Sequence, residues 1–468
     1  MKIIIIGSGK VGYTLAENLV KEKFDVIVID KNHYALERIE NNLDVMCIKG
    51  NGVSTGILLE AGVDTADLLI AVTESDEINM VCCLTAKKLG VLKTIARIRD
   101  PEYAAELSIL KEQLGLNLVI NPEQAAAEEI ANSISFSSAI NIESFAKGMV
   151  KMIDLKATAD MNIVGKTIQK IDRETNSSVL IGVIVRAGKV IVPKGDFIIE
   201  NNDDMYIIGK HSCIYNFCKH YNREPQKIKK VMIVGGGRIS YYLSKALNEM
   251  GVKVKIIEKN RERCEELSEL LPEILVINED GTDEEILLSE NIGDMDGFIA
   301  VTGMDEENLM SSLIAKRSGV KKVITKISRT NYINIVKEIG LDSIISPKLI
   351  ITNHILRYVK GKKLDAFLRL IDGQAEILEF VIKDDNRILN KPIKDLNIPK
   401  NVIIATIVRK NEVVVPHGRD MFKKGDRIVV ISMGKNISSL DELCITTPGG
   451  AHNEFFNGIK KLGSLINM

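Results

Sequence analysis

The chain carries two copies of one sequence pattern, and this duplication constrains its fold more than any other feature. An apolar run precedes the glycine-rich segment Gly7–Gly12 (GSGKVG), and a second apolar run precedes Gly235–Ser240 (GGGRIS), 228 residues later. Val26–Asp30 recurs as Val254–Glu258 at the same offset. Because repetition at a nearly constant offset does not arise by chance, we interpret the chain as a tandem duplication.

Each copy alternates short β-rich runs with helical patterns, which predicts a parallel sheet with helices on both of its faces. In the first copy these runs begin at Lys2 and end at Ile120, and they suffice for a complete doubly wound fold. Asn121-Pro122 follows. Because Asn suits a helix cap and Pro suits a first helical turn, a crossover helix is expected there. Ser346-Pro347 predicts a matching crossover helix in the second copy.

A smaller segment after each crossover helix is repeated as well. Val192–Gly195 matches Val415–Gly418, and we align Asp204–Ile208 with Asp426–Val430. Neither segment has a glycine loop, and their buried runs and turns predict small α+β domains. The predicted class is therefore α/β, with doubly wound parallel-sheet (Rossmann) domains at 1–121 and 228–346, small α+β domains with crossover helices at 122–221 and 347–446, and a tail at 447–468.

Composition argues against several classes of protein. A net charge of −1 over 468 residues gives no sign of nucleic-acid binding, and no apolar run approaches the roughly 18–20 residues that cross a membrane. Seven cysteines, an odd number, form no disulfide framework and fit a reducing cytosol. His211, Cys213, Cys218 and His220 have the chemistry of zinc ligands, but a helix would place them on two opposite faces, so no metal site is predicted.

The strongest functional signal is the context of the first glycine loop, which reads strand, GxGxxG, helix, strand and acidic residue. Gly7 permits the tight turn, Gly9 lets the backbone approach a pyrophosphate, and Gly12 lets the helix lie against the strand. The free N–H groups at the start of that helix are suited to bind phosphate. Asp30 can accept a hydrogen bond from a ribose 2′-hydroxyl and would repel a 2′-phosphate, which favours NAD or AMP-type nucleotides over NADP.

The second loop departs slightly from this pattern. Gly235 and Gly237 are present, Ser240 replaces the third glycine, and Glu258 matches Asp30. We predict nucleotide binding here too, with an empty pocket on a retained fold as the alternative.

Further polar positions follow the predicted strands, at the sheet edge where such folds bind ligands. Asn and Asp beside glycine follow the third strands, threonines follow the fourth, and one cation ends each fifth strand. Lys10 and Arg238 also match each other, inside the loops. A solvated charge is the alternative interpretation of these cations. The predicted cofactor-binding residues are Gly7, Ser8, Gly9, Lys10, Val11, Gly12, Asp30, Asn51, Gly52, Thr73, Glu74 and Arg97 in the first copy, and Gly235, Gly236, Gly237, Arg238, Ile239, Ser240, Glu258, Asp280, Gly281, Thr302 and Lys326 in the second. No catalytic residue is predicted.

A Rossmann lobe followed by a small lobe, twice over, resembles the TrkA family, the peripheral cytosolic subunits of Trk potassium-uptake systems. Each half resembles a regulator-of-potassium-conductance (KTN) unit. The resemblance spans essentially the whole chain up to the tail and is most specific at Gly7–Gly12 with Asp30, at Thr73-Glu74 and at Arg97. Gly303, which stands where the first copy has Glu74, departs from the pattern, as does Ser240.

The resemblance implies a regulatory role without catalysis. Such subunits bind NAD(H) or adenine nucleotides such as ATP and ADP, and assemble as homo-oligomers, dimers or tetrameric rings, beneath a membrane potassium-translocating subunit. The expected location is cytoplasmic, at the inner face of the cell membrane, and the small domains would be regulatory.

Two other hypotheses remain open: an NAD-dependent oxidoreductase with duplicated Rossmann domains, and a cytosolic regulator of a different channel or antiporter. The small lobes offer no His–carboxylate or Ser–Lys pair at a spacing that suggests catalysis, which weighs against the oxidoreductase.

Overall fold

The chain divides into two compact units. The computed structural model describes residues 1–105, 111, 114–135, 142–175, 178–341, 343–360, 366–370, 374–383, 386, 388–396, 398–399, 401–433, 437 and 440. The first unit comprises Met1–Ile142 and Pro225–Leu356, and the second comprises Glu143–Glu224 and the described residues from Arg357 onward. The tail expected at 447–468 lies outside the described residues.

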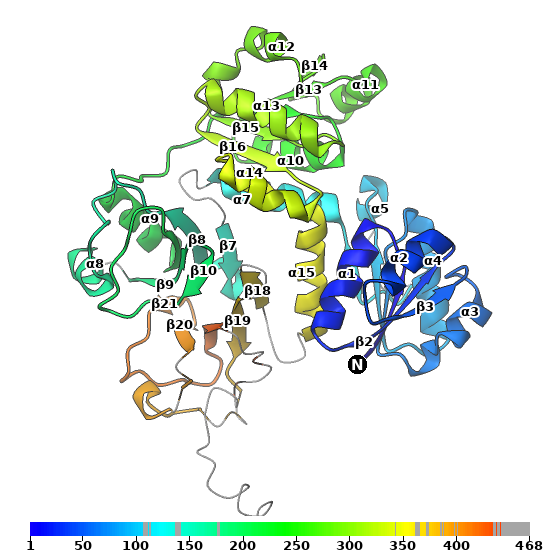
Figure 1. Ribbon diagram of the computed structural model, residues 1–468, viewed down its shortest axis with the longest axis horizontal. Coiled ribbons are helices and arrows are strands. Elements are labelled where there is room, and N and C mark those ends of the chain that lie inside the picture. Colours follow the sequence, from blue (N-terminus) through cyan, green and yellow to red (C-terminus); the bar gives the residue numbers. More distant parts are fainter. Residues whose placement is uncertain are drawn as a thin grey trace, which may run out of the picture. The chain divides into compact units, whose positions relative to one another are not determined.

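The first lobe of the first unit, drawn in blue to cyan in Figure 1, contains a six-stranded parallel sheet. Its strand order is β3-β2-β1-β4-β5-β6. Its strands are β1 (Lys2–Ile6), β2 (Asp25–Asp30), β3 (Met46–Lys49), β4 (Leu68–Ala71), β5 (Lys93–Arg97) and β6 (Leu118–Ile120). Its helices are α1 (Lys10–Lys21), α2 (His33–Glu40), α3 (Thr55–Glu60), α4 (Asp76–Lys88) and α5 (Pro101–Ala105), with a 3₁₀ turn at Val63–Thr65.

The second lobe repeats this topology, with the strand order β14-β13-β12-β15-β16-β17. Its strands are β12 (Lys230–Val234), β13 (Lys253–Glu258), β14 (Leu275–Asn278), β15 (Gly297–Ala300), β16 (Lys322–Lys326) and β17 (Ser343–Ile345). Its helices are α10 (Arg238–Glu249), α11 (Arg261–Leu270), α12 (Glu284–Ser289), α13 (Asp305–Arg317) and α14 (Ile333–Glu338), with 3₁₀ turns at Ile292–Asp294 and Thr330–Tyr332. In each sheet the strand order changes direction at the first strand of the copy, β1 or β12. The glycine loop that follows this strand therefore lies at the topological switch point of a doubly wound fold.

Burial explains why these strands are uninterrupted apolar runs. Helices cover both faces of each sheet, so Ile3, Ile4 and Ile5 of β1 are fully buried even though consecutive side chains point to opposite faces. Val231, Met232 and Ile233 of β12 are equally buried. The predicted α/β class with two doubly wound domains is confirmed.

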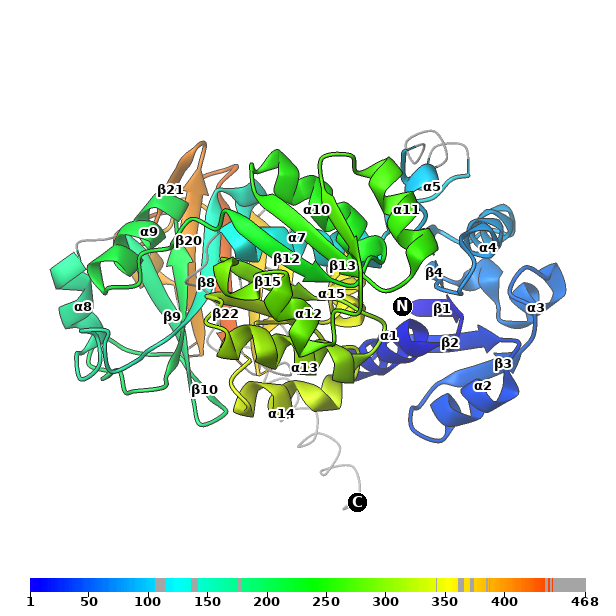
Figure 2. The same ribbon diagram turned by 90° about the horizontal axis from the view of Figure 1, so that it is seen from above.

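The crossover helix α7 (Pro122–Ser135) begins where the sequence predicts. The Asn121 side-chain oxygen accepts hydrogen bonds from the backbone N–H groups of Glu123 (3.1 Å) and Gln124 (3.0 Å), which caps the helix. Its apolar face packs on α10 of the second lobe (Figures 1 and 2), because Ala127 and Ile130 share one buried core with Leu243 of that helix. The matching helix of the second copy is α15 (Pro347–Lys360).

The second unit holds two five-stranded sheets, ordered β10-β9-β11-β8-β7 and β18-β19-β22-β20-β21. The first contains β7 (Ile142–Phe145), β8 (Val150–Lys156), β9 (Val179–Arg186), β10 (Lys189–Ile191) and β11 (Asp204–Gly209), with α8 (Ile168–Thr175), α9 (His211–His220) and a 3₁₀ turn at Ala146–Gly148. The second contains β18 (Ala366–Leu370), β19 (Ala375–Val381), β20 (Val402–Arg409), β21 (Glu412–Val414) and β22 (Arg427–Met433), with a 3₁₀ turn at Ile393–Asp395.

The two small sheets pack against each other around one core, which Figure 2 shows as neighbouring strands β9 and β20. Val183 and Ile208 of the first sheet are buried with Ile377 and Ile431 of the second. The duplicated small lobes therefore supply the two layers of a single sandwich.

The structure corrects the alignment of the small lobes by one residue. Arg186 binds the carboxylate of Asp203 through Nε and Nη2, both at 2.7 Å, and Arg409 binds Asp426 in the same two-pronged way. Asp203, rather than Asp204, is thus the counterpart of Asp426. Adjacent aspartates at 203 and 204 made the two registers indistinguishable by residue type alone.

Among the residues that the structure describes, no helix is long and apolar enough to cross a membrane. The described part of the chain also contains no group of three or more His, Cys, Asp or Glu side chains placed to hold a metal ion. On α9, Cys218 is buried, whereas His211 and His220 are exposed.

Candidate functional site

The glycine loop of the first lobe is closely packed against its own helix. Gly7 has φ +106°, a conformation that favours glycine, and its N–H donates to the Ile29 carbonyl at 2.9 Å. A Cβ on Gly12 would lie 1.8 Å from the Gly7 carbonyl oxygen. By contrast, a Cβ on Gly9 would meet no atom within 4 Å. The loop is therefore tight beneath the helix and open above its first turn, where the helical N–H groups are free for an anion.

The acidic residue at the end of β2 binds the same loop. The Asp30 carboxylate accepts hydrogen bonds from Ser8 through its N–H (2.5 Å) and its hydroxyl (2.6 Å), and from the Asn32 N–H (2.9 Å). Partial burial works to raise the pKa of Asp30, but these hydrogen bonds outweigh it and hold that pKa below its usual value. Asp30 is thus ionised at neutral pH and is fixed beside the loop.

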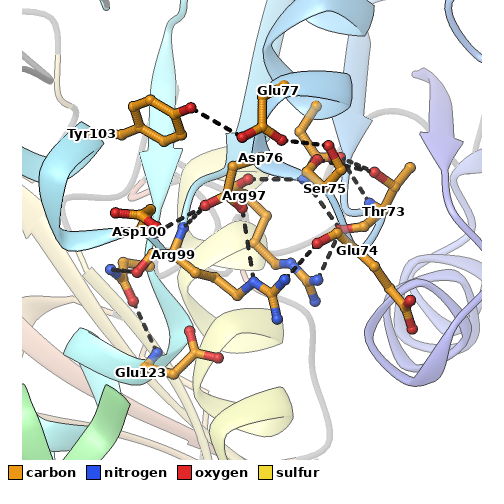
Figure 3. A network of polar contacts seen from close by, with 12 residues as sticks. Thr73, Glu74, Ser75, Asp76, Glu77, Arg97, Arg99, Asp100, Tyr103 and Glu123 are labelled. Carbon is orange, nitrogen blue, oxygen red and sulfur yellow. Dashed lines mark hydrogen bonds and ion pairs between the residues drawn. The ribbon is translucent and has the colours of Figure 1, made fainter. Parts of the chain in front are cut away.

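A polar network forms the other wall of the crevice (Figure 3). The Arg97 guanidinium donates through Nη2 to the Thr73 carbonyl at 2.8 Å, and Arg99 donates to the Glu74 carbonyl. Burial and the neighbouring Arg99 charge lower the pKa of Arg97, while nearby carboxylates oppose that shift. Because Arg97 Nε is buried without a hydrogen-bond partner among the described residues, this cation retains an unused donor beside the crevice.

Two side chains at the start of α4 hold this wall together. Asn79 accepts from the Thr73 N–H at 2.8 Å and donates to the Arg97 carbonyl at 2.9 Å. Asp76 accepts from the backbone N–H groups of Arg99 (2.8 Å) and Asp100 (2.9 Å). These contacts fix the loops after β4 and β5 with respect to each other.

The loop, Asp30 and this network enclose a crevice of about 970 Å³. That volume lies near the upper end of the roughly 300–1,000 Å³ typical of small-molecule sites. Of the predicted residues, Gly7, Ser8, Gly9, Lys10, Val11, Asp30, Asn51, Gly52, Thr73, Glu74 and Arg97 line it. Gly12 does not, because it lies beneath the loop against Gly7.

The second lobe builds a related crevice on the same plan. Gly235 has φ +98°, and the Glu258 carboxylate accepts from the N–H groups of Gly236 (2.5 Å) and Asn260 (2.8 Å). Ser240 stands at the tight position of Gly12, and its hydroxyl donates to the Gly235 carbonyl. A small polar side chain thus replaces the close glycine contact with a hydrogen bond.

The network after β15 repeats the one after β4. Asn308 accepts from the Thr302 N–H at 2.7 Å, Lys326 donates to the Thr302 carbonyl at 2.6 Å, and Asp305 accepts from the N–H groups of Ser328 and Arg329, both at 2.8 Å. Burial lowers the pKa of Lys326, although Asp305 acts in the opposite direction.

This second crevice has a volume of about 310 Å³. Of the predicted residues, Gly235, Gly236, Gly237, Glu258, Asp280, Gly281 and Thr302 line it. The structure places four others elsewhere: Ile239 is in the hydrophobic core, Ser240 is buried under the loop, Lys326 lies behind Thr302, and Arg238 does not line the crevice.

Sequence reasoning missed residues in both crevices. Lys31, Asn32, Ile78 and Arg99 also line the first, and Lys259, Thr282, Met304 and Glu307 also line the second. The supporting pairs Asp76 with Asp305 and Asn79 with Asn308 recur at an offset of 229 residues. That recurrence was a usable signal, because identical polar residues at helix starts in both copies indicate a shared structural task.

Comparison with known proteins gives consistent matches along the chain. Residues 3–122 and 231–347 match the TrkA-N domain, and residues 152–221 and 377–444 match the TrkA-C domain. The Trk system potassium uptake protein TrkA homolog 1 of Methanosarcina mazei is 36% identical over 450 residues, which is 94% of this chain and 99% of that protein. TrkA of Haemophilus influenzae is 34% identical over 451 residues, 95% and 98% of the two chains.

Solved structures share the fold. The GsuK channel bound to NAD superposes with a TM-score of 0.61 at 17% identity and covers 92% of this chain and 77% of that one. The GsuK RCK domain gives the same TM-score and identity and covers 92% of each chain.

Proposed function

This chain belongs to the TrkA family, and from that premise we propose that it is the nucleotide-sensing subunit that regulates a membrane potassium-uptake transporter. Its TrkA relatives are named for Trk potassium uptake, and the match covers nearly their whole length. We further propose NAD(H) as the ligand of the first crevice, with ATP and ADP as competing adenine nucleotides.

The observation that carries this proposal is the first crevice itself. It combines an open helix N-terminus above Gly9, an ionised Asp30 at the end of the neighbouring strand, and the guanidinium groups of Arg97 and Arg99. These groups suit a pyrophosphate and a ribose 2′-hydroxyl, respectively, with the arginines adding positive charge. A solved structure of the same fold was described with NAD bound, which supports the choice of ligand.

Regulation follows from linkage. A nucleotide shifts an equilibrium between two states of the chain only by binding one of them more tightly, and the transporter responds if it too distinguishes those states. We propose that the partner is a membrane potassium-translocating subunit, that the chain binds it as a homo-oligomer, and that it does so at the inner face of the cell membrane.

Potassium flux tests this function. Inside-out vesicles from cells that lack the chain would be supplied with purified chain and with NADH, NAD, ADP or ATP in turn. We expect potassium flux to depend on the added nucleotide, and Gly9→Asp, which occupies the open space above the loop, to abolish that dependence. The exposed Asp25→Asn at the start of β2 is the matched control.

Two results would contradict the proposal. One is potassium flux that is the same with and without the chain and with each of the nucleotides. The other is steady oxidation of NADH by the purified chain with a small carbonyl substrate, which is the behaviour of an oxidoreductase.

A further inference from the structure

The two crevices are lined by opposite net charge. The first is lined by the cations Lys10, Lys31, Arg97 and Arg99 and by the carboxylates Asp30 and Glu74. Among the described residues, the second is lined by one cation, Lys259, and by the carboxylates Glu258, Asp280 and Glu307. The excess of positive charge around the first crevice favours anionic ligands, and the excess of negative charge around the second disfavours them.

The difference arises at matched positions of the duplication. Asp280 stands where the first copy has Asn51, Glu307 where it has Ile78, and Ser328 where it has Arg99, each at an offset of 229 residues. The polar network supports this alignment, because Thr302, Asn308 and Lys326 make the contacts of Thr73, Asn79 and Arg97 at the same offset.

Two cations at the second crevice, Lys259 in its lining and Lys326 behind its wall, are already engaged. Lys259, the cation that lines this crevice among the described residues, lies 3.3 Å from the Glu307 carboxylate. Lys326 donates to the Thr302 carbonyl behind the crevice wall. A polyphosphate would therefore meet three carboxylates and no cation that is free of a partner in the described lining.

The second crevice is also the smaller of the two: its volume is about 310 Å³, against about 970 Å³ for the first. At the loop, Ala35 lines the first crevice, whereas the matched Arg263 donates from Nε to the Gly236 carbonyl at 2.7 Å and does not line the second. The second volume is at the lower end of the range for small-molecule sites.

Other features of a nucleotide site are retained. A Cβ on Gly237 would meet no atom within 4 Å, so the start of α10 is open to one anionic group, and Glu258 occupies the position of Asp30. We propose that the second crevice selects an adenosine ligand with a single phosphate over pyrophosphate- and triphosphate-bearing ligands, while the first crevice takes the dinucleotide. This inference rests on the proposed function, since it assigns different ligands to the two sites of one sensor.

Matched glycine variants separate the two sites in the full-length chain. Gly9→Asp blocks the first crevice and Gly237→Asp the second, and both glycines have room for a side chain and φ values near those of helix caps, where Asp is favoured. The double variant gives the calorimetric baseline, and circular dichroism verifies folding. Each protein would be titrated with AMP, ADP, ATP and NADH.

In the Gly9→Asp protein we expect AMP to bind about tenfold or more tightly than ATP or NADH, with the gap narrowing as salt screens the carboxylates. Adding Asp280→Asn and Glu307→Ile, the residues of the first copy, should strengthen ADP and NADH binding by about tenfold and change AMP binding little. In the Gly237→Asp protein NADH should bind, and salt should weaken it.

The outcomes distinguish this inference from the proposed function. If the Gly9→Asp protein binds ATP or NADH as tightly as AMP, or binds none of them while the Gly237→Asp protein binds NADH, the inference is wrong and the proposed function stands. If neither single variant nor the unmodified chain binds any of the four nucleotides, both are wrong.

Discussion

At the residue scale, the two glycines of the first loop have different tasks. Gly12 is required by packing, because a Cβ there would approach the Gly7 carbonyl oxygen to 1.8 Å, whereas Gly9 leaves open space for a ligand. Sequence reasoning assigned both roles from the motif. It grouped Gly12 with the ligand-binding residues, however, since a motif gives spacing and does not show which side of the backbone a residue faces.

The first prediction concerns this pair. Gly12→Ala should lower the free energy of unfolding by about 1–3 kcal/mol, as overpacking does in cores. Gly9→Ala should change it by no more than about 0.5 kcal/mol, as is usual for open positions. Urea unfolding of both variants measures the difference. Equal stabilities would show that Gly12 is not packed tightly against the Gly7 carbonyl oxygen.

A second prediction follows from the hydrogen bonds to Asp30. Its pKa is lowered in the folded chain, so its ionised form stabilises the fold above the ordinary value of 3.8 and the gain is lost as pH falls through the lower folded value. Asp30→Asn should therefore reduce stability at pH 7, and the difference from the unmodified chain should shrink toward pH 3. The exposed Asp25→Asn serves as control. A loss of stability in Asp30→Asn that stays constant with pH would argue against this account.

At the element scale, helix α7 shows what a sequence pattern can and cannot predict. Asn121-Pro122 located its first turn, because capping is a local interaction. The apolar spacing of Ala127 and Ile130 indicates a buried face, yet it carries no information on which lobe covers that face. The structure places it on α10 of the second lobe.

The third prediction tests that packing. Ile130 is fully buried, so Ile130→Ala should cost about 2–5 kcal/mol of unfolding free energy. Glu128, on the exposed face of the same helix, should tolerate alanine with a change of about 0.5 kcal/mol or less. A negligible effect of Ile130→Ala would mean that α7 does not form part of the core of the second lobe.

The register of the small lobes was predicted less well than the sheets themselves. Apolar runs identified β9 and β20, but the alignment of β11 with β22 was one residue off until the paired contacts of Arg186 and Arg409 fixed it. A one-residue slip reverses the face of every side chain in a strand, so the correction changes which residues of the two sheets are equivalent.

At the scale of the whole molecule, the duplication predicted the fold of each half, while the differences between the halves emerged only from side-chain placement. Glu307 matches Ile78, for example, but only the position of its side chain shows that its carboxylate lines the second crevice. Contacts between the two copies could not be predicted from the sequence either, because a sequence repeat does not specify how the two repeated domains pack against each other.

One such contact gives a fourth prediction. The Tyr242 hydroxyl on α10 accepts from the Asn121 amide at 3.0 Å and donates to the Arg99 carbonyl at 3.3 Å, which links the second lobe to the wall of the first crevice. Tyr242→Phe should cost about 1 kcal/mol of unfolding free energy, the usual net value of such bonds. The hydroxyl of the neighbouring Tyr241 accepts an exposed hydrogen bond from the Lys245 ammonium at 3.3 Å, so Tyr241→Phe should cost almost nothing. Equal losses in thermal unfolding would contradict the link.

An experimental structure of the chain with NADH tests whether the first crevice is a nucleotide site. We expect the pyrophosphate on the backbone N–H groups at the start of α1 and the adenine ribose 2′-hydroxyl within hydrogen-bonding distance of the Asp30 carboxylate. Density for NADH elsewhere, or a first crevice left empty at saturating NADH, would contradict it.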